Sequence, residues 1–152
     1  GVDASRYFFL MRSLDSQLDF DINLAKSRSN DNPVYYVQYA YARICSILKN
    51  APKYHRQDEY TLLTTAKETD LLKHINEFTD TVNDCAVHRS PNKLCNYAQK
   101  LAGYFHSFYG SCKVIDETQP ELMNERLCLL EATKITLKNC LELLGIEAPE
   151  QM

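Results

Sequence analysis

The chain has 152 residues and a formal net charge of −3, with 45% hydrophobic and 24% charged residues. These fractions are typical of a single domain with its own core, and no stretch reaches the roughly twenty apolar residues that span a bilayer. The weak negative charge argues against a protein that coats nucleic acids without selectivity. Because the chain starts at Gly1 rather than at a methionine, we expect a fragment of a longer protein.

Positive charge is concentrated in two stretches that contain no acidic residue, residues 33–57 and 85–115. The segments that follow them, 58–84 and 116–152, hold seven and eight acids. Two basic elements on an acidic body suit an anionic partner that is bound locally, although solvated helix faces give the same pattern.

Glycine is rare and the prolines fall between periodic segments, which predicts an all-helical bundle. We expect Asp3 to cap a first helix that ends near Ser13. Residues 18–22 alternate apolar and polar side chains, so we expect an extended segment there, followed by a helix over residues 22–29. The apolar side of the first helix repeats Phe8, Met11 and Leu14.

The next expected helix begins at Pro33 and ends near Asn50. Asn32 is a favourable N-cap, and proline suits the first helical position because its missing N–H has no partner there. Gln38 falls on the opposite side of this helix from the face considered next, where we expect it to satisfy backbone groups.

Tyr36, Tyr39 and Arg43 share one face of this helix, within roughly 60° of one another at about 100° per residue. This face lies on the border between the polar and the apolar side. Two phenols and a guanidinium group in such a place can stack on unpaired bases and hold a phosphate. The same spacing is also typical of tyrosines that pack in the core of an amphipathic helix. Tyrosines at helical spacing have this structural role more often than a binding role.

The second half of the chain is expected to hold four helices joined by short loops. The last of them carries a near-heptad stripe of leucines and ends at Gly145 as a C′ residue. We expect His74 on the solvent side of its helix, and His106 packed rather than acting as a base. The expected helices cover residues 58–63, 68–82, 91–109 and 120–144.

Residues that support catalysis or metal binding are scarce. The six cysteines form no Cys-x-x-Cys pair, which argues against structural zinc, and unpaired thiols predict a reducing cytoplasm. Asp19 and Asp21 flank Phe20, and we expect them to face solvent rather than to act as a catalytic pair. Three of the cysteines are expected to be small buried residues: Cys45, Cys128 and Cys140.

Five segments carry strings that are more specific than composition. They are DASRYF at 3–8, LDFD at 18–21, NPVYYVQYAYARI at 32–44, FHSFY at 105–109 with CKV at 112–114, and LLGIEAPEQM at 143–152. Together, in order and over nearly the whole chain, they resemble the C-terminal third of bacterial arginyl-tRNA synthetases. The tyrosine-rich string and the C-terminal ending are the most specific.

The resemblance implies a class I aminoacyl-tRNA synthetase, in which a catalytic domain precedes an α-helical anticodon-binding domain. Residues 1–30 would be the connecting segment and residues 31–152 the anticodon-binding domain. Neither a His-x-Gly-His string nor a Lys-Met-Ser-Lys-type loop occurs. We therefore expect no cofactor in this chain and no arginine activation by it alone, with ATP and Mg bound by the parent enzyme.

In that family the helix with the tyrosine-rich string faces the anticodon loop, together with the extreme C-terminus. The resemblance thus implies an RNA-binding site of five residues, of which Met152 closes the pocket. They are Tyr36, Tyr39, Arg43, Lys113 and Met152. The implied partners are the anticodon loop of tRNA-Arg and the catalytic domain of the same chain, with no membrane and with a monomeric state.

Three alternatives stay open at this point. A free-standing helical interaction module would use the tyrosine face to bind a protein helix. The equivalent domain of a related class I synthetase would also be all-helical. A helical bundle without any nucleic-acid role is the third.

Overall fold

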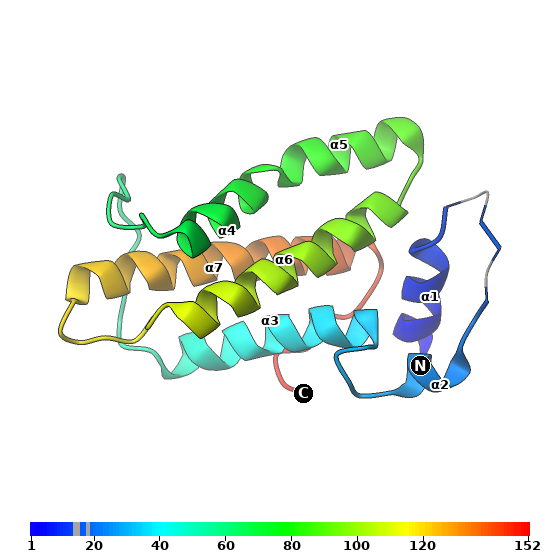
Figure 1. Ribbon diagram of the computed structural model, residues 1–152, viewed down its shortest axis with the longest axis horizontal. Helices are drawn as coiled ribbons and strands as arrows, with labels where there is room; N and C mark the ends of the chain where they lie inside the picture. Colours follow the sequence, from blue (N-terminus) through cyan, green and yellow to red (C-terminus); the bar gives the residue numbers. More distant parts are fainter. Residues whose placement is uncertain (14–15, 18) are drawn as a thin grey trace.

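The structure is a computed structural model that describes residues 1–13, 16–17 and 19–152, and the described part of the chain is all-helical (Figure 1). The expected fold class is therefore confirmed. The expectations for Leu14 and Leu18 lie outside the described residues. The helices are α1 (Val2–Leu10), α2 (Ile22–Lys26), α3 (Pro33–Asn50), α4 (Ala66–Asn76), α5 (Phe78–His88), α6 (Asn92–Ser111) and α7 (Pro120–Leu143).

The centre of the bundle is formed by α3, α6 and α7, which all pack against one another. Helix α4 packs across α6 and α7, α5 packs on α6, and α1 and α2 lie at the end of the bundle where α3 begins (Figure 1). Each fully buried leucine or phenylalanine contributes about 1.5–3 kcal/mol. The largest such side chains include Phe105, Phe108, Leu101, Leu127, Leu130, Leu137 and Leu141. Within the described ranges, no helix has the length and apolar character needed to cross a membrane.

Helix α3 has the predicted bounds, Pro33–Asn50, with Asn32 as its N-cap residue and proline at its start, as predicted. Asn32 occupies the N-cap position without capping the helix through its side chain. Its Nδ2 instead donates to the carbonyls of Ala25 and Ser27. The predicted N-cap position is thus confirmed, and the Asn32 amide is engaged elsewhere because the preceding segment folds back and offers it carbonyl acceptors.

Helix α1 ends at Leu10 rather than near Ser13, and Gly1 rather than Asp3 is its N-cap. The Asp3 carboxylate accepts hydrogen bonds from Gln38 Nε2 and from the backbone N–H of Glu147. Gln38 Nε2 also lies within hydrogen-bond distance of the Glu147 carbonyl, which confirms that it satisfies the backbone. These contacts join α1, α3 and the segment after α7.

Of the expected extended lead-in to α2, Asp21 has an extended backbone, and its side chain caps the helix by accepting from the backbone N–H groups of Asn23 and Leu24. This capping role accounts for one of the two carboxylates considered as a catalytic pair. Helix α2 ends at Lys26 rather than at residue 29.

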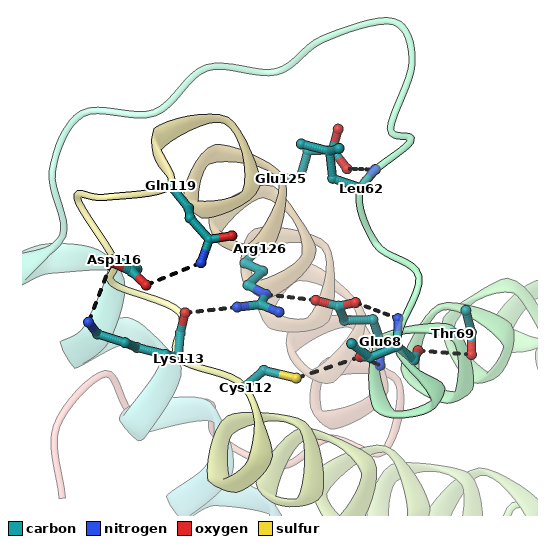
Figure 2. A network of polar contacts seen from close by, with 10 residues as sticks. Leu62, Glu68, Thr69, Cys112, Lys113, Asp116, Gln119, Glu125 and Arg126 are labelled. Atoms are coloured by element: carbon teal, nitrogen blue, oxygen red, sulfur yellow. Dashed lines mark hydrogen bonds and ion pairs between the residues drawn. The ribbon is translucent and has the colours of Figure 1, made fainter.

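Two predictions between α3 and α6 are wrong. Residues 58–63 are not helical, because the backbone N–H groups of Thr61 and Leu62 donate to the Glu125 carboxylate on α7. Figure 2 shows the contact of Leu62. The expected single helix over 68–82 is two helices, α4 and α5, which meet at Glu77. Helix α4 begins with a capping box, in which the Thr65 hydroxyl accepts from the backbone N–H of Glu68.

The end of α7 follows the prediction closely. Helix α7 stops at Leu143, and Gly145 adopts a φ of 66°, a conformation that favours glycine. The Ile146 N–H donates to the Leu141 carbonyl, and Arg6 donates to the Gly145 carbonyl. The five predicted leucines of the stripe are buried: Leu127, Leu130, Leu137, Leu141 and Leu144.

Candidate nucleic-acid interface

The predicted tyrosine face lies where α3 runs beside the second half of α6 (Figure 1). Tyr36 and Tyr39 both contact the ring of His106 on α6. The ring centroids of Tyr36 and His106 are 5.2 Å apart, and those of Tyr39 and His106 are 6.1 Å apart and nearly parallel. The two tyrosines thus share one support from the neighbouring helix.

Tyr36 packs on α6 with its hydroxyl group beside Gly103, at a distance that would leave ordinary van der Waals room for a Cβ. A Cβ at Gly103 would lie 3.6 Å from the Tyr36 hydroxyl oxygen. Tyr36 is half-buried, and this burial raises the pKa of its phenol. The hydroxyl therefore stays a neutral group that can donate a hydrogen bond.

Arg43 lies one turn further along α3, where its guanidinium carbon is 5.6 Å from the ring centroid of Tyr109. Tyr109 in turn packs against Phe105. Arg43 is exposed, so its cation is held by an aromatic ring while its other side faces solvent. The geometry brings Tyr36, Tyr39 and Arg43 to one face, as the helical spacing predicted.

The structure adds three aromatic residues to this face, Tyr35, His106 and Tyr109, and we call the six residues together the aromatic face. Tyr35 stacks on Tyr39 with centroids 6.0 Å apart and planes 11° from parallel. This contact between Tyr35 and Tyr39 could have been predicted from the sequence, because residues four apart on a helix are neighbours. For His106 and Tyr109 no such signal existed, since only packing brings α6 beside α3.

Lys113 lies in the loop after α6, and among the described residues no hydrogen bond or ion pair joins it to the aromatic face. Its ammonium group pairs with Asp116 at 3.4 Å, and its carbonyl accepts from Arg126 at 3.0 Å (Figure 2). Met152 is exposed and lines a hollow with Arg28 and Tyr35. Both remain predicted RNA contacts, and only Met152 neighbours the aromatic face through Tyr35.

A buried ion pair anchors the end of the bundle that carries the Lys113 loop (Figure 2). Arg126 Nε donates to Glu68 at 2.6 Å, and the Glu68 side chain has no exposed surface. The second Glu68 oxygen accepts from the Thr65 backbone N–H at 2.8 Å. Through Arg126, the start of α4, the second turn of α7 and the loop after α6 are joined.

The remaining candidate groups are structural. His74 is buried, and its ring lies 4.2 Å from that of Tyr97, so the prediction of a solvent-facing His74 is wrong. The ring fills the contact between α4 and α6 that the helical wheel alone could not reveal. Cys45, Cys128 and Cys140 are buried, as predicted. In the part of the chain that the structure describes, no group of three or more potential ligands is placed to hold a metal ion.

His106 is expected to titrate at lower pH than an ordinary histidine. Burial and then the nearby Arg43 lower its pKa from 6.5, and its Nε2 has no hydrogen-bond partner in the described structure. The folded chain therefore binds fewer protons here than the unfolded chain. The stability that neutral His106 contributes to the folded chain is present above pH 6.5, and it is lost as the pH falls through the pKa of His106 in the folded chain.

We expect the wild type to lose stability between pH 7 and pH 5 more steeply than a His106→Gln variant, in urea unfolding at each pH. A histidine NMR titration of the wild type would give the pKa directly. The same slope in both proteins, or a His106 pKa above 6.5, would contradict the prediction.

These features define a class: an all-helical domain with stacked aromatic rings and an arginine on one face, as in proteins that bind single-stranded RNA. The chain belongs to the DALR anticodon binding domain family, whose sequence model matches residues 37–152. The expected division of the chain between residues 30 and 31 stays a prediction.

Curated relatives that are 48–49% identical to the chain are arginine–tRNA ligases. Arginine–tRNA ligase 1 of Halalkalibacterium halodurans is 48% identical over all of this chain, which covers 28% of that protein. The arginine–tRNA ligase of Listeria monocytogenes is 49% identical with the same coverage. The chain thus spans little more than a quarter of the length of these curated relatives.

Solved arginyl-tRNA synthetases share the fold. The enzyme of Plasmodium falciparum matches 99% of this chain with a TM-score of 0.88 and 32% identity, over 27% of its own chain. The enzyme of Thermus thermophilus matches 99% of this chain with a TM-score of 0.85 and 30% identity, over 26% of its own chain. The similarity over the whole chain does not favour a free-standing interaction module.

Proposed function

We propose that this chain is the anticodon-binding part of an arginine–tRNA ligase, and that its aromatic face binds the anticodon loop of tRNA-Arg. The observation that carries the proposal is the joint placement of Tyr36 and Tyr39 on His106, with Arg43 held over Tyr109. The similarity to arginine–tRNA ligases supports the choice of tRNA.

The proposed mechanism is recognition of unstacked bases. Loop bases leave their stack, pack on the rings of Tyr36 and Tyr39, and are hydrogen-bonded along their edges. Arg43 supplies a planar cation for a phosphate or a base edge. Few phosphates are neutralised in such a complex, so the salt dependence of binding is modest.

The parent enzyme would attach arginine to tRNA-Arg with ATP and Mg, using a catalytic domain in the same polypeptide. This assignment rests on the relatives, which carry that enzyme name. We place the enzyme in the cytoplasm as a monomer, with no cofactor in this chain.

The test is binding of the chain to an anticodon stem-loop of tRNA-Arg, measured by fluorescence anisotropy. We expect at least about tenfold tighter binding than to the same stem with a scrambled anticodon, the scale of one lost base contact. Equal affinity for both loops, or no binding to either, would contradict the proposal.

A further inference from the structure

Two polar side chains of α1 contact the start of the segment after α7, residues 145–152, which we call the C-terminal segment. The Asp3 carboxylate accepts from the backbone N–H of Glu147 at 3.2 Å, and the Arg6 guanidinium group donates to the Gly145 carbonyl. Asp3 and Arg6 are three residues apart in α1, so they project from the same side of the helix. One side of α1 thus binds the backbone of the C-terminal segment at two points.

The turn at Gly145 fits closely against Arg6. Its φ of 66° favours glycine, and a Cβ at this position would lie only 3.0 Å from Arg6 Nη1. The next side chain, that of Ile146, is buried, and the Ile146 backbone N–H donates to the Leu141 carbonyl at 2.8 Å. The chain therefore leaves α7 in one direction, which takes it past Arg6 and then Asp3.

Helix α1 is itself fixed to the centre of the bundle. Tyr7 has no exposed surface, and its hydroxyl group donates to the Cys95 carbonyl on α6 at 3.1 Å. The Asp3 carboxylate also accepts from Gln38 Nε2 on α3 at 3.1 Å, and the same nitrogen lies 3.0 Å from the Glu147 carbonyl oxygen. Asp3, Gln38 and Glu147 therefore form a closed triangle of hydrogen bonds that joins α1, α3 and the C-terminal segment.

The C-terminal segment continues from this triangle to Met152, five residues beyond Glu147. Ala148 packs against the hydrophobic core, and Glu150 and Gln151 line a hollow with residues of α3. A segment that is already ordered loses less conformational entropy when it binds a partner. Contacts that order residue 147 thus favour binding at the end of the chain without touching the RNA.

We infer that Asp3 is a positioning residue, through which α1 holds the C-terminal segment in the conformation that binds RNA. Asp3 fixes the backbone of Glu147, and this fixed point sets where Met152 lies. The inference rests on the proposed function and deepens it. It also makes α1 a working part of the anticodon-binding domain, although residues 1–30 were expected only to connect that domain to another one.

The first test needs no RNA and measures amide hydrogen exchange by NMR. Asp3→Ala should make exchange at the Glu147 amide about tenfold faster, because this N–H loses a hydrogen bond to a charged group. The matched control is Asp80→Ala, which removes an acid from the first turn of α5 as Asp3→Ala does from that of α1. It should leave exchange at Glu147 unchanged. Unchanged exchange at Glu147 in Asp3→Ala would overturn the inference.

The second test measures the affinity for the tRNA-Arg anticodon stem-loop by fluorescence anisotropy. Asp3→Ala should weaken binding about five- to tenfold, as expected when an ordered segment becomes free. Loss of a negative charge by itself acts in the opposite direction, so Asp80→Ala should bind as tightly as the wild type or more tightly. Asp3→Asn keeps an acceptor oxygen and should lie between Asp3→Ala and the wild type. Tighter binding by Asp3→Ala would show that the carboxylate acts only through its charge, and the inference would be wrong.

A double-mutant cycle shows whether Asp3 acts through the end of the chain. If it does, Asp3→Ala combined with Met152→Ala should bind no more weakly than Met152→Ala alone. Penalties that multiply in the double variant would place the action of Asp3 elsewhere and contradict the inference.

The outcomes also distinguish this inference from the proposed function. If the wild type binds the stem-loop and Asp3→Ala binds equally well, Asp3 does not position the RNA-binding segment and the proposed function stands. If the wild type does not bind the stem-loop, the proposed function fails and the positioning role of Asp3 fails with it.

Discussion

Replacing Tyr39 by alanine is expected to weaken binding of the tRNA-Arg anticodon stem-loop by roughly ten- to a hundredfold, the range of a lost base–aromatic stack. Tyr39 is half-exposed and lies between Tyr35 and His106, so its removal takes away one ring and also interrupts the row that positions the others. A filter-binding or anisotropy titration measures the change.

Two variants control this experiment. Tyr39→Phe keeps the ring and loses only the hydroxyl, so it should retain most of the affinity. Tyr104→Ala removes an exposed tyrosine that lies against His74 on another side of α6, and it should leave RNA binding unchanged. Unchanged affinity of a folded Tyr39→Ala variant, with helicity checked by circular dichroism, would count against the assignment of the face.

Removal of the Arg126 guanidinium is expected to cost about 3 kcal/mol of folding free energy, because it leaves the Glu68 carboxylate buried without its partner. The variant for this test is Arg126→Met, because methionine keeps most of the volume of the aliphatic part of the arginine side chain. Urea unfolding followed by circular dichroism gives the change in free energy.

A second variant shows whether the buried charge is the cause. Glu68→Gln combined with Arg126→Met removes both charges and leaves an acceptor for the Thr65 N–H, so it should recover part of the stability lost in the single variant. A loss below about 1 kcal/mol in Arg126→Met, or no recovery in the double variant, would show that the pair contributes little.

The ion pair of Arg126 with Glu68 also makes the folding stability depend on pH. Burial by itself would raise the pKa of Glu68, but hydrogen bonds to Thr65 and Arg126 and the charge of Arg126 hold it below its ordinary value of 4.5. The unfolded chain therefore binds the proton more readily. The stability from this carboxylate is present above pH 4.5 and is lost as the pH falls through the folded pKa.

The start of α3 illustrates how far local signals reach. Asn32 and Pro33 predicted the first residue of α3 correctly, because proline lacks an N–H group and the first N–H of a helix has no acceptor within the helix. The partner of the Asn32 side chain was beyond prediction, because the competing carbonyls of Ala25 and Ser27 arrive through the path of the preceding segment.

The segment between α3 and α4 illustrates the opposite case. Residues 58–63 have a local pattern compatible with a helix, yet Glu125 on α7 accepts two of their backbone N–H groups. The acceptor is more than sixty residues away in the chain, so no window of sequence contains it. The break between α4 and α5 at Glu77 likewise carries no proline or glycine that would mark it.

The sequence by itself determined the helical class, the bounds of α3 and the shared face of Tyr36, Tyr39 and Arg43, because helical periodicity and end signals act within one element. Its strings also led to the family that the comparisons confirm. Only the tertiary structure decided what supports that face and what borders it. His106 lies under the two tyrosines, and Arg28 and Met152 lie beside Tyr35, because packing joins segments whose separation along the chain carries no spatial information.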